Sequence, residues 1–201
     1  QLNMLKAGIV FADQLTPVSP TYAQEIQADP GGCGLEGVLA GRASELTGIV
    51  NGIDVETWNP RTDELIPRHY SDNDVKQGKY TARVALAARL GHAAPDDRPL
   101  VAFVGRLAEQ KGVSLVLDLL QRMAGSGNVR FVVLGAGDPH LEESLRGVAS
   151  KYPDAIDVVI GFDEVLAHLI QAAADILLMP SQYEPCGLAQ LYAFRYGTIP
   201  V

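Results

Sequence analysis

The sequence predicts an α/β fold in which a doubly wound parallel sheet occupies residues 99–201. Short, continuously apolar runs such as residues 101–104 and 131–134 are typical of strands that are covered on both faces. Each run is followed by a segment with helical spacing of apolar residues, so neighbouring strands are expected to pair in parallel through right-handed crossovers. Ligands of such sheets bind outside the carboxyl ends of the strands, and the loops that follow the strands are therefore the candidate sites.

The alternation gives the elements of this part in order. Strands are expected at residues 99–105, 128–135, 156–161, 175–181 and, as the start of a further strand, 198–201. The helices expected between them are residues 112–123, 139–152, 164–174 and 187–197. Asp138 and Asp163 are expected as N-cap residues, with Pro139 at the first helical position after Asp138.

Residues 1–47 indicate the carboxyl-terminal end of another α/β unit. Ser19 and Pro20 are suited to the N-cap and first position of a helix. The elements expected in and just after this part are helices at 5–12 and 20–26, strands at 14–19 and 46–52, and a glycine-rich loop at 28–34.

Residues 48–98 are predicted to form an interdomain connection. Residues 53–78 are polar and interrupted by prolines, and the helix expected at 79–91 ends with Gly91 in the C′ position. Because the chain begins without methionine and stops on an apolar run, we expect a fragment with a truncated last domain.

Composition restricts the function. A formal net charge of −8 argues against a general binder of nucleic acid or of anionic membranes, and no apolar stretch is long enough to span a membrane. Cys33 and Cys186 show no ligand spacing, which predicts neither a disulfide framework nor a metal site and fits a reducing, cytoplasmic setting. The four histidines, also without ligand spacing, are expected to be surface or structural residues: His69, His92, His140 and His168.

The first strand-end loop, "GRLAEQKG" at residues 105–112, carries two cations. It lacks the glycine before lysine and the hydroxyl residue after it that a phosphate-binding P-loop requires. Arg106 directly after a strand and Lys111 at the start of a helix could instead converge on one anion, backed by the helix dipole. The alternative is two solvated surface cations.

The next two loops offer smaller signals. Gly135 and Gly137 in "LGAGDP" permit close backbone approach to a ligand, although each is equally explained by a structural turn. Phe162 in "GFDE" follows a strand and could cover a base, and the alternative is packing in the core.

The fourth loop, "SQYEPCGLAQ", places a carboxylate where a helix begins. Glu184 is an unusual cap residue, and the backbone N–H groups that follow could hold a phosphate while the carboxylate binds sugar hydroxyls.

Together these loops, with "VSPTYAQEI" and "VNGID" upstream, closely resemble bacterial glycogen synthases and plant starch synthases. The resemblance covers almost the whole chain, and "EPCGLAQLY" is its most specific part. It implies a GT-B fold of two Rossmann-like domains, with residues 99–201 as the truncated nucleotide-sugar domain. It also implies retaining transfer of glucose from ADP-glucose to the non-reducing end of an α-1,4-glucan, without a metal or other cofactor, and this chain alone is expected to be inactive.

Residue by residue, the resemblance assigns the donor site. Arg106 and Lys111 would neutralise the diphosphate leaving group, and Glu184 would bind hydroxyls of the donor glucose. The remaining donor-binding residues that it implies are Asn51, Asp54, Gly135, Gly137, Phe162, Cys186, Gly187 and Leu188.

One position separates this family from the wider GT-B superfamily. The superfamily often has a second glutamate eight residues after the first, and this chain shares tyrosine with the glycogen synthases there, at Tyr192. Two alternatives stay open at this point, namely a retaining GT-B transferase that uses UDP-glucose and a non-catalytic nucleotide- or glycan-binding module.

Overall fold

The computed structural model describes residues 3–95 and 97–201, which divide into two compact units. The first unit ends at Gly52 and also takes in Glu184–Leu188, and the second comprises Ile53–Tyr183 and Ala189–Val201.

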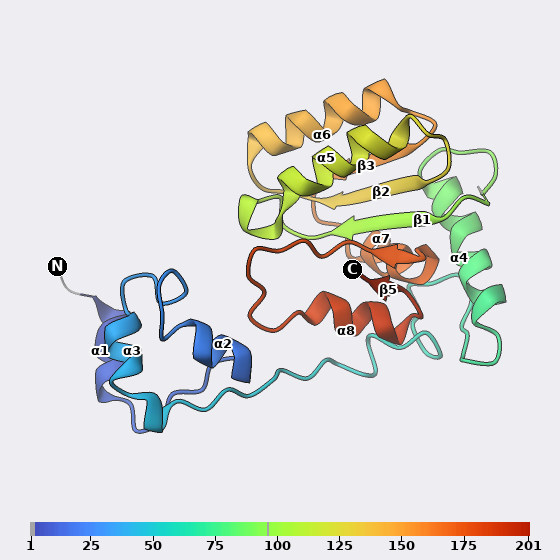
Figure 1. Ribbon diagram of the computed structural model, residues 1–201. Helices are drawn as coiled ribbons and strands as arrows, with labels where there is room; N and C mark the ends of the chain where they lie inside the picture. Colours follow the sequence, from blue (N-terminus) through green and yellow to red (C-terminus); the bar gives the residue numbers. More distant parts are fainter. Residues whose placement is uncertain (1–2, 96) are drawn as a thin grey trace. The chain divides into compact units, whose positions relative to one another are not determined.

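The second unit contains a five-stranded parallel sheet, which confirms the predicted fold class (Figure 1). The strand order is β3-β2-β1-β4-β5. Strands β2 and β3 are added on one side of β1 and strands β4 and β5 on the other, so the order of strand addition reverses between β1 and β4. In doubly wound sheets this reversal opens a crevice at the carboxyl ends of the strands. The strands are β1 (Leu100–Val104), β2 (Arg130–Gly135), β3 (Ile156–Ile160), β4 (Ile176–Leu177) and β5 (Ile199–Pro200).

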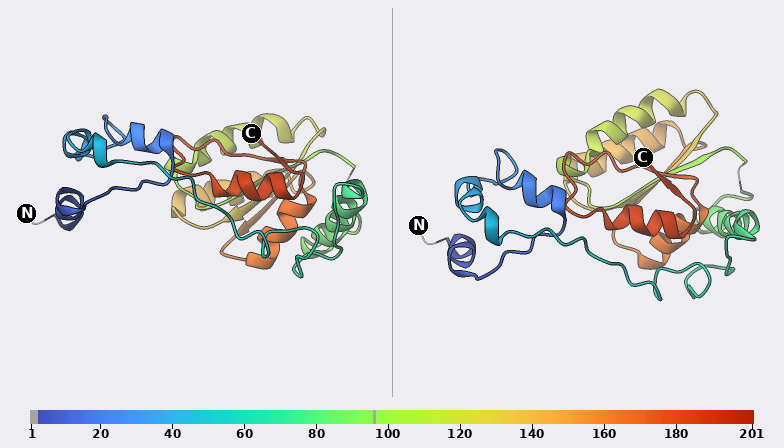
Figure 2. Two further views of the ribbon diagram at one scale, coloured as in Figure 1. Left: turned by 90° about the horizontal axis from the view of Figure 1, so that it is seen from below. Right: turned by 60° about the horizontal axis from the view of Figure 1, so that its bottom comes forward.

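Helices cover both faces of the sheet, as the continuous apolar runs predict (Figures 1 and 2). Successive residues of a strand point to opposite faces. Val101 and Phe103 accordingly pack with α5 and α6, whereas Leu100 and Ala102 pack with α4, α7 and α8. The helices are α4 (Val75–Arg89), α5 (Val113–Ala124), α6 (Pro139–Lys151), α7 (Glu164–Ala173) and α8 (Leu188–Arg195).

The predicted N-caps form in this unit. The Asp138 carboxylate accepts a hydrogen bond from the His140 N–H at 2.8 Å, and the Asp163 carboxylate accepts one from the Leu166 N–H at 2.9 Å. Gly91, expected after α4, has the left-handed φ of 84° typical of a C′ residue.

Helix α4 begins four residues earlier than predicted, at Val75 rather than at Lys79. Gly78 looks like a helix breaker in the sequence, but it lies inside the helix under the ring of Tyr70. A Cβ atom at position 78 would lie 2.2 Å from Cγ of Tyr70, so close packing requires the glycine there.

The first unit is mainly helical around a small core of Ile9, Ile26 and Leu39. Ser19 caps α2 as predicted, accepting from the Tyr22 N–H at 3.0 Å. The elements of this unit are α1 (Met4–Phe11), α2 (Pro20–Glu25), α3 (Glu36–Ala40) and the short 3-10 helix η1 (Ala43–Glu45).

The two strands predicted in the amino-terminal part are wrong as full strands. Among the described residues of these two segments, only Leu15 and Leu46 form a parallel bridge, which a hydrogen bond from the Ile49 N–H to the Pro17 carbonyl extends. Pro17 has no N–H to donate, so it cannot continue the ladder.

Candidate functional site

Backbone hydrogen bonds join the loops after β1 and β2. The Gly105 N–H donates to the Leu134 carbonyl at 3.0 Å, the Leu107 N–H donates to the Ala136 carbonyl at 2.9 Å, and the Leu107 carbonyl accepts from Asp138 at 2.8 Å. The Leu107 side chain is fully buried. Arg106 is therefore held between two fixed neighbours while its own side chain is exposed at the carboxyl edge of the sheet.

Gly135 and Gly137 allow the backbones of these two loops to approach each other closely. A Cβ atom would lie 2.0 Å from the Gly105 carbonyl oxygen at position 135, and 2.1 Å from the Leu107 carbonyl oxygen at position 137. The Gly137 N–H donates to the Glu142 carboxylate at 3.0 Å. These glycines thus allow the protein's own loops to pack closely, as expected if they are structural turns. Any ligand contact by them remains a prediction.

A pocket of about 330 Å³ opens beside these two loops, within the volume range of small-molecule sites. It brings Arg106, Gly135 and Phe162 together from three successive strand-end loops. Phe162 is 94% exposed, so core packing does not explain it. An exposed aromatic ring and a cation that line one pocket suit a planar base joined to a phosphate.

Lys111 lies in the 3-10 helix η2 (Glu109–Lys111), which turns the chain from the β1 loop into α5. Its side chain is half-buried. The guanidinium Nη2 of Arg106 donates to Oε1 of Gln110 at 2.6 Å, so the arginine head points toward this corner. Convergence of Arg106 and Lys111 on one anion remains a prediction.

The fourth loop leads into α8. Glu184 and Cys186 are half-buried, the Cys186 thiol is free, and Gly187 takes a left-handed φ of 73° directly before α8 begins at Leu188. That φ explains why glycine precedes the helix. These residues group with the first compact unit, and their approach to the pocket stays a prediction.

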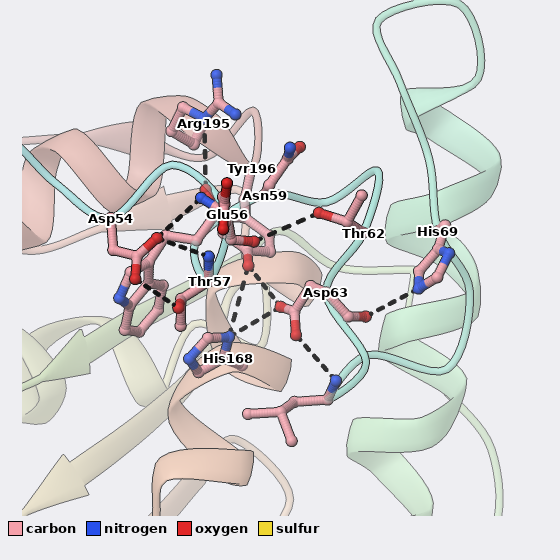
Figure 3. Close-up of polar contacts among 12 residues, drawn as sticks. Asp54, Glu56, Thr57, Asn59, Thr62, Asp63, His69, His168, Arg195 and Tyr196 are labelled. Carbon is pink, nitrogen blue, oxygen red and sulfur yellow. Dashed lines mark hydrogen bonds and ion pairs between the residues drawn. The ribbon is translucent and has the colours of Figure 1, made fainter.

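Asp54 has a clear structural role. Its carboxylate accepts hydrogen bonds from the N–H groups of Thr57 at 3.0 Å and Glu56 at 2.9 Å, and from the Thr57 hydroxyl at 2.8 Å (Figure 3). These bonds, those from Thr57 first, hold the pKa of Asp54 below its usual value. Asn51 is exposed, and donor binding by either residue remains a prediction.

A buried cluster that no sequence pattern predicts packs the connecting segment against α7 and α8. Nδ1 of His168 lies 2.8 Å from the Asp63 carboxylate, which also accepts from the Tyr196 hydroxyl at 2.5 Å (Figure 3). The Trp58 ring stacks between those of His168 and Tyr192, at centroid distances of 3.8 Å and 3.9 Å. His168 is thus a structural residue, as expected. The only signal in the sequence was the single tryptophan in an otherwise polar segment.

The charge of Asp63 is maintained by its partners. Burial raises the pKa of this carboxyl group, but the hydrogen bonds from His168, Tyr196 and the Leu65 N–H outweigh burial and hold the pKa below its usual value. The ionised carboxylate is therefore the form that this cluster stabilises.

Among the residues that the structure describes, no helix combines the length and apolar composition needed to cross a membrane. Nor do the described side chains of His, Cys, Asp and Glu form a group of three that could hold a metal ion.

Two family profiles match the chain. "Glycosyl transferases group 1" matches residues 87–201, and "Starch synthase catalytic domain" matches residues 1–41. Among curated proteins, a glycogen synthase from Anaeromyxobacter sp. is 54% identical over all 201 residues, and glycogen synthase 2 from Nitrosococcus oceani is 49% identical over the same length. The chain covers 42% and 40% of these two relatives, so it spans less than half of their length.

Solved structures agree with these matches. The catalytic domain of starch synthase IV from Arabidopsis thaliana, bound to ADP and acarbose, superposes with a TM-score of 0.91 at 40% identity, over 99% of this chain and 41% of that one. Sucrose-phosphate synthase from Thermosynechococcus elongatus, at 23% identity and a TM-score of 0.61 over 98% of this chain and 42% of that one, shares the fold.

Proposed function

We propose, on the premise that this chain belongs to the glycosyl transferases group 1 family, that the complete gene product transfers glucose from ADP-glucose to the non-reducing end of an α-1,4-glucan. The observation that carries the proposal is the similarity to glycogen synthases, 54% identity in one relative, along all 201 residues. Since the chain spans less than half of such relatives, we assign the acceptor site to sequence outside it.

The strand-end loops would bind the donor. Phe162 would stack on the adenine at the rim of the pocket, and Arg106 and Lys111 would face the diphosphate. Glu184 would accept hydrogen bonds from hydroxyls of the glucose, and the amides of Cys186, Gly187 and Leu188 would approach the phosphates from the start of α8. Asn51, Asp54, Gly135 and Gly137 would line or support the same site.

The residue types suit this chemistry. Breaking the bond between glucose and the diphosphate leaves positive charge on the anomeric carbon and negative charge on the departing phosphate. Fixed cations at the phosphate stabilise that separated charge more than they stabilise the intact donor, which lowers the barrier. Retention of configuration and independence of a metal ion belong to the same proposal, as does a cytoplasmic location, which the free thiols of Cys33 and Cys186 support.

Calorimetry of the complete gene product with ADP, UDP, ADP-glucose and UDP-glucose tests the donor assignment. We expect the adenine compounds to bind at least about tenfold more tightly than their uracil counterparts, a difference of about 1.4 kcal/mol. Preference for UDP would support a different retaining transferase. Binding of ADP without transfer of labelled glucose to glycogen would support a binding module instead.

The role of Glu184 can be separated from nucleotide binding. We expect Glu184→Gln to lower kcat about 10- to 100-fold, because a neutral amide accepts hydrogen bonds from sugar hydroxyls less strongly than a carboxylate does. ADP affinity, measured by calorimetry on the same protein, should stay within about twofold of wild type. A large loss of ADP affinity would assign Glu184 to the nucleotide or to folding.

A further inference from the structure

We infer that Gln110 is a positioning residue, which orients the guanidinium of Arg106 toward the departing diphosphate and joins it to the loop that leads to Glu184. The inference rests on the proposed function and adds to it a residue that none of the loop patterns singled out.

The backbone of Gln110 is fixed by the loop after β4. Its carbonyl accepts a hydrogen bond from the Gln182 N–H at 2.9 Å. Two residues later, Gly112 has a left-handed φ of 68°, and a Cβ atom there would lie 2.0 Å from the Pro180 carbonyl oxygen. The η2 corner and residues 180–182 therefore pack backbone against backbone, beyond the carboxyl ends of the neighbouring strands β1 and β4.

The side chain of Gln110 extends this connection to Arg106. Its Oε1 accepts from Nη2 of Arg106 at 2.6 Å, and its Nε2 donates to the Tyr183 carbonyl at 3.4 Å, which is a long and weak bond. Rotating the amide by 180° would set NH₂ against the guanidinium and oxygen against a carbonyl. Both neighbours thus favour the same orientation of the amide.

Only an amide of this length suits both neighbours without altering the charge. A carboxylate would accept from Arg106 but could not donate to Tyr183, and it would neutralise the cation that the leaving group needs. A methionine would fill the space and make neither bond. Arg106 is exposed, and an exposed arginine loses rotamer entropy when it is held in one position. Because the neutral Gln110 side chain already holds the guanidinium before the donor binds, this entropy is not lost during the reaction.

The alternative is that Gln110 only holds the η2 corner and the loop after β4 together. A purely structural contact of this kind would affect stability whether or not Arg106 is present. Positioning would act through Arg106, so its effect would vanish once that side chain is removed. A double-mutant cycle distinguishes the two.

The experiment compares four forms of the complete gene product: wild type, Gln110→Met, Arg106→Ala and the double variant. We expect Gln110→Met to lower kcat about tenfold with less than about a threefold change in KM for ADP-glucose, and to weaken ADP binding. Neither effect should be seen in the Arg106→Ala background. Gln121→Met, at an exposed glutamine of α5, is the matched control and should behave as wild type.

Gln110→Glu keeps size and polarity if the methionine variant does not fold. It should lower kcat at least as much as Gln110→Met, because it neutralises Arg106 while still accepting from it. Wild-type activity in either Gln110 variant, or equal losses with and without Arg106, would overturn the inference. A folded wild type that neither binds ADP nor transfers glucose would refute the proposed function instead.

Discussion

We expect Arg106→Ala in the complete gene product to lower kcat by about two to three orders of magnitude, the loss typical of removing one preorganised group at a developing charge. The Arg106 backbone is fixed by the hydrogen bonds of Gly105 and Leu107, and its head is held by Gln110. The alanine variant therefore removes a charge that is already in place, and water does not provide an equally oriented replacement.

Lys111→Ala should have an effect of the same order if both cations face the diphosphate. Arg122→Ala is the matched control, since Arg122 is an exposed arginine of α5 whose partner is Asp118 of the same helix. Transfer of labelled glucose from ADP-glucose to glycogen gives kcat for all three variants. Near-wild-type turnover in a folded Arg106 or Lys111 variant would identify that residue as a surface cation.

The sheet could be predicted because its signals are local. Residues 131–134 form a continuous apolar run. The structure buries Val132 and Leu134 on one face of the sheet and Phe131 and Val133 on the other. N-caps such as Ser19 and Asp163 depend on residues within three positions of the helix start, so the sequence contains the whole interaction.

The site could be predicted only in part, because its geometry depends on distant residues. A Gly-x-Gly pattern is the same whether the glycines admit a ligand or a neighbouring loop, and only the structure shows the Gly105 and Leu107 carbonyls against Gly135 and Gly137.

Packing contacts outside the local sequence patterns could not be predicted either. Tyr70 lies over Gly78 in α4, and this contact makes the glycine compatible with the helix. The partners of Trp58 come from α7 and α8, far along the chain, and no spacing rule connects them.

The cluster around Trp58 also gives a reason for Tyr192. A glutamate at this position, as in much of the GT-B superfamily, would remove one face of the stack and place a carboxylate against the indole. Tyrosine instead provides a nearly parallel ring, at an interplanar angle of 11°. The segment before α4 and the helix that follows the fourth loop are thereby packed together within the second unit.

We expect Trp58→Ala to reduce the free energy of unfolding of the second unit by about 3–5 kcal/mol, the usual cost of deleting a large packed aromatic side chain. The indole lies between His168 and Tyr192, and His168 is itself fully buried and paired with Asp63. Its removal would leave a gap beside the buried hydrogen bond between His168 and Asp63, and water entering that gap would weaken this bond.

Two further variants are compared with Trp58→Ala to show how large its effect on stability is. Trp58→Phe keeps a ring in the stack and should cost less than Trp58→Ala, while Tyr80→Ala, at a tyrosine of α4 that is 52% exposed, should change stability by no more than about 0.5–1 kcal/mol. Urea unfolding followed by far-UV circular dichroism compares the three with wild type. If Trp58→Ala were as mild as Tyr80→Ala, the stack would contribute nothing beyond an ordinary surface contact. Helix α8 would then be held by its core-packing residues Ala189 and Ala193 and by Tyr196 directly after it.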